Sequence, residues 1–195
     1  MADSRALLLD AAADEFAVYG FKGARVQAIV KRAGVNERMI YHHFGSKEGL
    51  YAAVMLEQRH TLGAAWMPIL DKAAAMDPYE GMKTALSGYL DLVTARPQAV
   101  ALFIHEALSD WSVSHLPTAD QLPPQLRELY ARGQREGVFP AGRPFEIAYM
   151  TAICALMGLT VFSHHFASSE DDTRPELTPE LRTHIMAQLL DGLRA

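Results

Sequence analysis

Basic side chains are concentrated in one short stretch of this sequence. Between Phe21 and Lys47 there are six lysines and arginines and a single acidic residue, Glu37, although the 195-residue chain carries a net charge of −5. A cationic cluster on an acidic protein localises the face that binds a polyanion such as duplex DNA. A solvated helical face is the alternative, and charge alone does not exclude it. The basic residues are Lys22, Arg25, Lys31, Arg32, Arg38 and Lys47.

Patterns that would support catalysis or metal binding are weak elsewhere in the chain. His105-Glu106 begins like the helix of a zinc protease, but Ser109 stands where the second histidine would fall. His164 and His165 are adjacent, so on a helix they point about 100° apart and are poorly placed to share one metal ion. The sequence also has no glycine-rich phosphate loop, nucleophile elbow or cysteine–histidine pair. We therefore expect no enzyme, no metal site and no cofactor.

The basic stretch coincides with two short predicted helices joined at a glycine. Gly34 is suited to the left-handed conformation that ends a helix, and Asn36 is a good N-cap for the next helix. The first helix has an apolar face at helical spacing. That face consists of Val26, Ile29, Val30 and Ala33.

The second of these helices has few apolar anchors and many side chains that are free for a partner. Its anchors are Met39, Ile40 and Phe44. The remaining residues are divided between solvent and a partner, as in a recognition helix that lies in the major groove. They are Glu37, Arg38, Tyr41, His42 and His43.

A further helix is predicted on each side of this helix-turn-helix. Apolar residues recur at helical spacing from Ser4 to Tyr19, and Gly20 supplies the stop. After the recognition helix, Ser46 caps another helix and places Lys47 at its N-terminus. A cation there opposes the helix dipole, so an exposed lysine is less expected than one beside a DNA phosphate.

Several segments within the first fifty or so residues share the spacing of one protein family. They are Leu9-Asp10-Ala11-Ala12, Phe16, Tyr19-Gly20-Phe21, Ile29, Ala33-Gly34-Val35, Ile40-Tyr41-His42-His43-Phe44 and Ser46-Lys47-Glu48-Gly49-Leu50. This specific pattern, which covers roughly the first quarter of the chain, resembles the N-terminal domain of the TetR/AcrR family of transcriptional regulators.

The resemblance implies an all-helical dimeric repressor. It would have three N-terminal helices for DNA, a connecting fourth helix, and a variable C-terminal domain that binds an inducer and dimerises. By this likeness, Tyr41, His43 and Lys47 match positions that usually hold phosphates. Glu37, Arg38, Met39 and His42 match positions that can face bases. Lys22, Arg25 and Asn36 complete the DNA-binding set that we predict.

The sequence departs from the family pattern at two places. Where the second helix commonly begins with Thr-Thr or Thr-Ser, this chain has Ala24-Arg25, so the usual hydroxyl cap and phosphate contact are lost. Arg25 is placed to replace the contact electrostatically. Arg38 occupies a position where a small residue or proline is common. These departures affect the operator sequence rather than the ability to bind DNA.

The rest of the chain is predicted to be wholly helical. Pro68 should kink or end the long helix that begins near Ser46. Three further helices are predicted over residues 78–95, 97–108 and 123–136, the last of them ended by Gly137. The sequence therefore predicts a helix-turn-helix domain at residues 1–50 and a ligand-binding and dimerisation domain at residues 51–195.

The run from Ile147 to Phe166 contains no aspartate, glutamate, lysine or arginine. This run is nearly as long as a membrane span. Its polar interruptions favour a core helix with a second face in a subunit interface. Together with a last helix that opens at Thr178, it would suit a four-helix dimer bundle. Cys154, the only cysteine, is predicted to be a small core residue.

Aromatic and methionine side chains in the C-terminal part are the types that line a mainly apolar ligand cavity. Taken singly, each is more often a core residue. His105 is the first candidate for a polar group that orients a small, largely apolar or aromatic effector. The predicted lining residues are Trp66, Tyr89, Phe103, His105, Trp111, Met150 and Met157.

Three classes of function remain from the sequence. The first is a ligand-responsive dimeric repressor on a palindromic operator, and the second is a constitutive DNA-binding regulator without an inducer. An enzyme or carrier that uses a C-terminal cavity is the third, and it lacks a reactive constellation. Asp3 and Asp10 interrupt the cationic start and apolar run of an export signal, so we expect a cytoplasmic protein.

Overall fold

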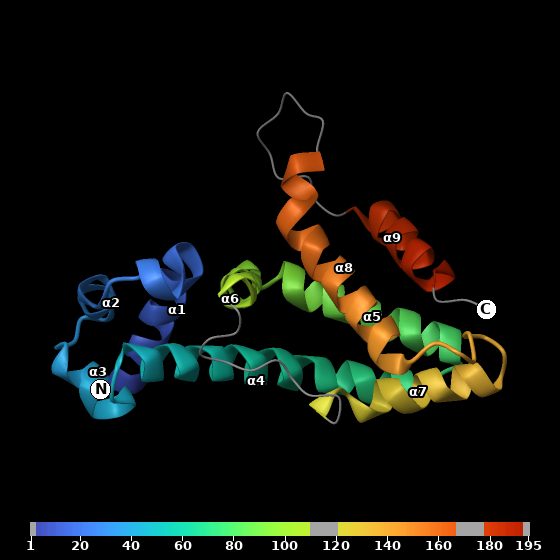
Figure 1. Ribbon diagram of the computed structural model, residues 1–195, viewed down its shortest axis with the longest axis horizontal. Coiled ribbons are helices and arrows are strands. Elements are labelled where there is room, and N and C mark those ends of the chain that lie inside the picture. Colours follow the sequence, from blue (N-terminus) through green and yellow to red (C-terminus); the bar gives the residue numbers. More distant parts are fainter. Residues whose placement is uncertain (1–2, 110–120, 167–177, 193–195) are drawn as a thin grey trace. The chain divides into compact units, whose positions relative to one another are not determined.

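The computed structural model describes residues 3–109, 121–166 and 178–192, and this part of the chain is helical without a β-strand (Figure 1). The expected all-α fold is therefore confirmed. The helices are α1 (Ser4–Gly23), α2 (Val26–Ala33), α3 (Arg38–Phe44), α4 (Lys47–Ala74), α5 (Pro78–Thr94), α6 (Pro97–Leu108), α7 (Pro124–Arg135), α8 (Phe145–Phe166) and α9 (Pro179–Asp191).

Contacts between residues divide the chain into two compact units. The first unit comprises Met1–Leu62 with Arg96–Leu116, and the second comprises Gly63–Ala95 with Pro117–Ala195. α6 therefore belongs to the same unit as the predicted helix-turn-helix, although residues 45–96 lie between them in the sequence. The functional division at residue 50 remains a prediction.

The first unit has one apolar core to which five helices contribute. Ile29 of α2 and Ile40 of α3 are fully buried, as are Phe16 of α1 and Leu102 of α6. Burial of one such side chain contributes about 1.5–3 kcal/mol. The short helices α2 and α3, of 8 and 7 residues, are too short to be stable alone, so this packing holds them in place.

α1 bends near its C-terminal end. Gly20 has φ 64° and ψ 177°, a conformation that essentially only glycine adopts. One further helical turn follows, and Ala24 then donates its N–H to the Gly20 carbonyl oxygen. The sequence predicted a stop at Gly20, and the glycine does break the helical path there.

In the second unit α5 packs against α7, α8 and α9 (Figure 1). Asp77 caps α5 by accepting from the N–H groups of Tyr79 and Glu80, and the Thr178 hydroxyl caps α9 by accepting from the Leu181 N–H. These caps place the helix starts close to the predicted positions. Pro68 does not end its helix, because α4 continues through it to Ala74.

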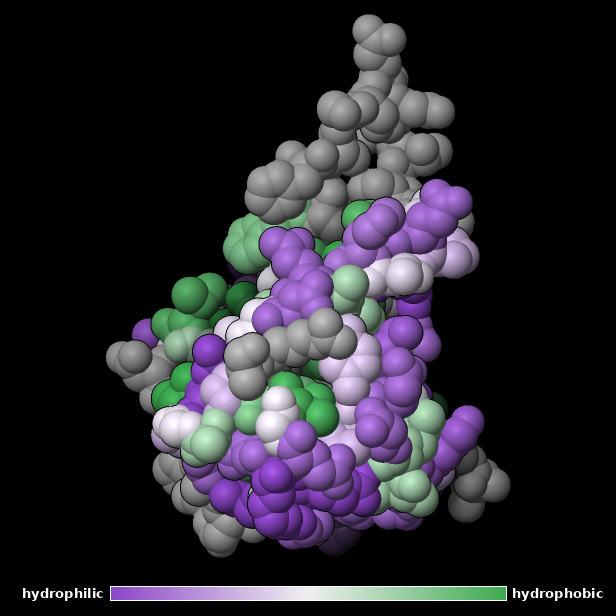
Figure 2. Space-filling model, turned by 90° about the vertical axis from the view of Figure 1, so that its right-hand side faces the viewer, coloured by the Kyte–Doolittle hydropathy of each residue, from purple (hydrophilic) through white to green (hydrophobic). Residues whose placement is uncertain are grey.

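α8 is, within the described residues, the one helix long and apolar enough to cross a membrane by length and composition. Only 22% of its Phe145–Phe162 segment is buried. The buried stripe consists of Phe145, Ala148, Ala152 and Leu156, and Cys154 lies off it. Cys154 is exposed, so the predicted core position is wrong. Figure 2 shows hydrophobic side chains reaching the surface on a face that is otherwise largely hydrophilic.

Candidate nucleic-acid interface

The turn between α2 and α3 has the geometry that its sequence predicts. Gly34 adopts a left-handed conformation, φ 67° and ψ 28°, and its N–H bonds to the Val30 carbonyl oxygen. Asn36 Oδ1 accepts a hydrogen bond of 2.9 Å from the Arg38 N–H, which satisfies a backbone donor in the first turn of α3. Asn36 is thus a capping residue, and any contact it makes with DNA remains a prediction.

α3 buries one side and exposes the other. Ile40 is fully buried, whereas Met39 and Phe44 pack against the core of the first unit and are half-buried. Arg38, Tyr41 and His42 are exposed and lie three and four residues apart, so they share one helix face. We call Arg38, Tyr41 and His42 the recognition face.

His43 is tied to α1 rather than fully presented to solvent. Its Nε2 lies 2.9 Å from the Ser4 hydroxyl oxygen, and the side chain is half-buried. The His42 and His43 rings are 4.9 Å apart in an edge-to-face arrangement. The Ser4 contact fixes the orientation of α3 against α1 and occupies one nitrogen of the His43 ring.

Other polar contacts separate the charged residues between Phe21 and Arg38 into two groups. Glu37 accepts a hydrogen bond of 2.5 Å from Gln27, and Arg32 forms an exposed ion pair of 2.6 Å with Asp14. Both side chains are thus engaged within the protein. The second group consists of cations that form no ion pair in the described part of the chain and remain available to an anion. They are Lys22, Arg25, Lys31 and Arg38.

Lys47, the first residue of α4, is half-buried in the same unit. Its Nζ donates a hydrogen bond of 2.7 Å to the Ala24 carbonyl oxygen and lies 4.9 Å from the centroid of the Phe21 ring. The Ser46 hydroxyl accepts a hydrogen bond from the Gly49 N–H, as a helix cap does. Lys47 therefore already has an oxygen acceptor, and its predicted phosphate contact would use one of its two remaining hydrogens.

Glu15 is a residue of this region that the sequence patterns did not predict. It is only 6% exposed, and its Oε1 accepts a hydrogen bond of 3.1 Å from the Arg25 N–H at the start of α2. This bond supplies the backbone partner that Ala24-Arg25 itself does not provide. A carboxylate on the apolar face of α1, beside Phe16, was the available signal, because a buried carboxylate needs a partner.

The sequence of this region is similar to that of known proteins. Residues 8–54 match the model of "Bacterial regulatory proteins, tetR family". The chain is 33% identical over 102 residues to the transcriptional regulator RutR of Escherichia coli, over 52% of this chain and 47% of RutR. It is 29% identical over 138 residues to the transcriptional repressor NicS of Pseudomonas putida, over 68% of this chain and 64% of NicS.

Residues 8–54 therefore belong to the TetR family of bacterial regulatory proteins. The match spans about half the length of RutR. The fold extends further, since a TetR family regulator from Shewanella superposes over 99% of both chains with a TM-score of 0.75 and 22% identity. KstR2 of Mycobacterium tuberculosis, described as a ketosteroid transcriptional regulator, covers 100% of this chain and 97% of its own, with a TM-score of 0.67 and 18% identity.

The predicted ligand-lining residues are divided between the two units, and Trp66, Tyr89, Met150 and Met157 belong to the second. Trp66 and Tyr89 pack at 4.8 Å between ring centroids, and Trp66 Nε1 donates to the Ala85 carbonyl oxygen. Met150 and Met157 are on α8, where Met150 is 43% exposed. Trp111 lies outside the described residues.

The other two predicted ligand residues lie in the first unit. Phe103 packs against its core, and His105 lies beside the bend in α1. A methyl group built on Gly20 would be 3.0 Å from His105 Nδ1, so the imidazole covers the glycine. The assignment of these two residues to a ligand remains a prediction.

A small cavity in the second unit is lined by other residues. It has a volume of about 10 Å³ and lies between α5, α7 and α8. Tyr130 and Tyr149 line it. The Tyr130 hydroxyl is buried without a hydrogen-bond partner, and burial raises the pKa of Tyr149 to about 12. The lining is completed by Met82, Leu86, Leu126, Phe145, Ala148 and Ala152.

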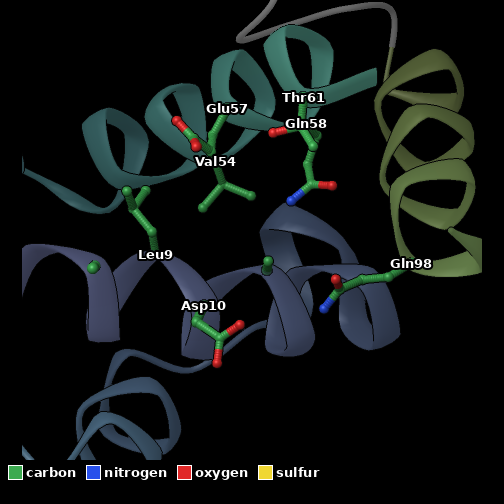
Figure 3. Close-up of a pocket in the computed structure, with 9 residues that line it drawn as sticks. Leu9, Asp10, Val54, Glu57, Gln58, Thr61 and Gln98 are labelled. Atoms are coloured by element: carbon green, nitrogen blue, oxygen red, sulfur yellow. The ribbon is translucent and has the colours of Figure 1, made fainter. Parts of the chain in front are cut away.

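A more open pocket of about 290 Å³ lies in the first unit between α1, α4 and α6 (Figure 3). Leu9 and Val54 point toward one another across it, and the amides of Gln58 and Gln98 face it (Figure 3). None of the predicted DNA-binding residues lines this pocket. In the described residues no group of three or more histidine, cysteine, aspartate or glutamate side chains is placed to hold a metal ion.

Proposed function

We propose that this protein is a DNA-binding transcriptional repressor that acts in the cytoplasm. The observation that carries the proposal is the recognition face of α3, exposed on a helix whose other side is buried and whose first turn is capped by Asn36. Arg38 would donate to guanine in the major groove, which is the commonest specific contact of that kind. Lys22 and Arg25, which have no ion pair, would contact phosphates on either side.

The binding unit would be a two-fold dimer. α8 leaves Ile147, Met150 and Phe162 exposed. Large apolar side chains exposed together on one helix are typical of a surface that binds another protein. Phe162 lines an apolar groove between α8 and α9 with Leu159, Ile185 and Leu189. A second copy of the chain would cover this surface. The operator would then be an inverted repeat whose half-sites are centred about one helical turn apart or slightly more.

A small, largely apolar molecule would release the repressor from DNA by binding in the second unit. The unpartnered Tyr130 hydroxyl beside Tyr149 suits a ligand that offers one polar atom within an apolar body. A cavity of about 10 Å³ holds no more than one water, so the bound form must be more open than the present structure. Coupling requires that the ligand prefer this open form over the form that binds DNA.

A constitutive DNA-binding regulator without an inducer is the second candidate. The closely packed surroundings of Trp66, Tyr89 and Tyr130 favour it, because a filled core offers no site for an effector. In this case the second unit would serve dimerisation alone.

Selection from a pool of random duplexes tests the DNA-binding proposal. The wild-type protein should enrich an inverted repeat over successive rounds, and failure to enrich any sequence would contradict a sequence-specific repressor. A thermal-shift screen of apolar and aromatic compounds, followed by titration of the selected operator with each hit, separates the two candidates. Hits that stabilise the protein and weaken operator binding support induction. Hits that leave operator affinity unchanged support the constitutive regulator.

A further inference from the structure

The pocket between α1, α4 and α6 lies wholly within the first unit (Figure 3). Leu9 and Asp10 line it from α1. On α4, Val54, Glu57 and Thr61 are three and four residues apart, so they share the helix face that lines the pocket. The volume of about 290 Å³ is close to the lower limit for a ligand pocket, so the pocket suits a small molecule.

The lining of this pocket carries negative charge without a compensating cation. Asp10 and Glu57 are exposed carboxylates, one from each helix, and neither forms an ion pair in the described part of the chain. None of the lining residues is a lysine, an arginine or a histidine. Asp14, one turn farther along α1, differs because it pairs with Arg32. An anionic ligand would therefore be repelled from the pocket, and a cationic ligand attracted.

The other polar side chains of the pocket add hydrogen-bond acceptors. The Gln98 amide nitrogen donates a hydrogen bond of 2.6 Å to Asp14, and its amide oxygen remains as an acceptor. The Gln58 amide extends from α4 toward α1 (Figure 3), and Thr61 follows about one turn later with a hydroxyl. An ammonium group has three hydrogens to donate and no acceptor, so it matches a set of oxygens of this kind.

The pocket also has an apolar part, which favours an organic cation over a metal ion. Leu9 and Val54 point toward one another across it (Figure 3). A hydrocarbon chain between these two side chains would bury apolar surface, which a hydrated metal ion has none of. In the described residues no group of three or more metal-binding side chains is placed to hold a metal ion, and this pocket has only two carboxylates.

We propose that this pocket binds a small aliphatic amine, with its ammonium groups beside Asp10 and Glu57 and its hydrocarbon chain between Leu9 and Val54. The site is separate from the apolar effector site proposed in the second unit, and it does not depend on DNA binding. The bound amine joins α4 to α1, the helix against which α2 and α3 pack. Because the amine binds the folded chain and not the unfolded chain, it raises the melting temperature.

Isothermal titration of the full-length protein with putrescine, a four-carbon diamine, tests the proposal. A saturable single-site isotherm is expected, together with a melting temperature that rises with putrescine concentration. The diol with the same carbon chain lacks the charges and should produce neither effect. Asp10→Asn and Glu57→Gln each remove one charge at an exposed position, so both variants should fold normally. Each should weaken putrescine binding roughly two- to fivefold, as expected for the loss of an exposed ion pair.

Glu48→Gln is the matched control on the same helix. Glu48 is an exposed carboxylate of α4 that does not line the pocket. Its replacement changes the net charge by the same amount as Glu57→Gln, and putrescine affinity should stay at the wild-type value. An equal fall in affinity for Glu48→Gln and Glu57→Gln would show a general attraction of the diamine to an acidic protein and overturn the proposal.

Thr61→Lys tests the same pocket from the opposite direction. Thr61 is exposed, so the longer side chain should not disturb the core, and it places an ammonium group beside Glu57. Putrescine binding should be lost while the folded state is retained. A wild-type protein without saturable binding, or unchanged affinity in Glu57→Gln or Thr61→Lys, would overturn the inference. None of these measurements uses DNA, so the proposed repressor function is tested separately by operator selection.

Discussion

Lys47 Nζ donates a hydrogen bond of 2.7 Å to the carbonyl oxygen of Ala24. The bond joins the first residue of α4 to the residue that ends α1 and precedes the start of α2. It explains how a lysine is tolerated at a helix N-terminus, where the helix dipole opposes a cation. Lys47 therefore has a structural partner in the absence of DNA, and its loss should affect both folding and DNA binding.

We predict that Lys47→Met lowers the free energy of unfolding by about 1 kcal/mol, because a hydrogen bond from a charged, half-buried donor is lost. Operator and unrelated duplexes should both be bound more weakly. Chemical denaturation and binding titrations measure the two effects. Lys22→Met is the control, since Lys22 is exposed without an ion pair and should change DNA affinity alone. Unfolding that is unaffected by Lys47→Met would contradict the structural role of the Ala24 contact.

The affinity for duplex DNA should fall steeply as salt rises, because Lys22, Arg25 and their neighbours release counterions from phosphates. A plot of log affinity against log salt concentration should be linear. Lys22→Ala should lower its slope by about one for each subunit that contacts DNA. Fluorescence anisotropy over a range of salt concentrations measures the slope. A flat salt dependence for the wild type would rule out phosphate contacts as the main source of affinity.

The turn and capping residues made much of the first unit predictable. Gly34, Asn36 and Ser46 act through their own backbone neighbours, so their sequence patterns located the ends of α2 and the starts of α3 and α4. Pro97 likewise marks the start of α6. Local chemistry of this kind depends on residues only a few positions apart, which a single sequence displays directly.

The contacts that the sequence did not predict join residues far apart in the chain. Leu102 shares a core with Phe16, and Gln98 bonds to Asp14, because α6 packs within the first unit. Periodicity locates the apolar face of α6 but not the helix against which that face packs. For the same reason Cys154, within an apolar run, was predicted to be buried and is exposed on α8.

We predict that Leu189→Glu disrupts the dimer. Leu189 lines the apolar groove with Phe162, so a carboxylate there would be desolvated beneath a second subunit without a partner. Sedimentation velocity at micromolar concentration should show a monomer, and operator binding should be lost with the dimer. His184→Glu, at an exposed position on α9, should remain dimeric. A Leu189→Glu variant that is dimeric and binds the operator would contradict this interface.

We predict that Tyr130→Phe weakens binding of any effector that offers a hydrogen-bonding atom, by roughly 1–2 kcal/mol. The hydroxyl has no protein partner to lose, so the melting temperature of the free protein should stay the same or rise. Isothermal titration with a compound from the thermal-shift screen measures the loss. Equal affinity in the two proteins would place the effector elsewhere than in the cavity beside Tyr149.

The most direct test of the recognition face compares the wild type with Arg38→Ala on a set of operators that carry every single base substitution. We predict that Arg38→Ala lowers the binding free energy for the best operator by roughly 1–3 kcal/mol and removes the base preference at about one base pair in each half-site. Preferences at the other positions should be unchanged. A variant that keeps the wild-type preference at every position would contradict base recognition by the exposed face of α3.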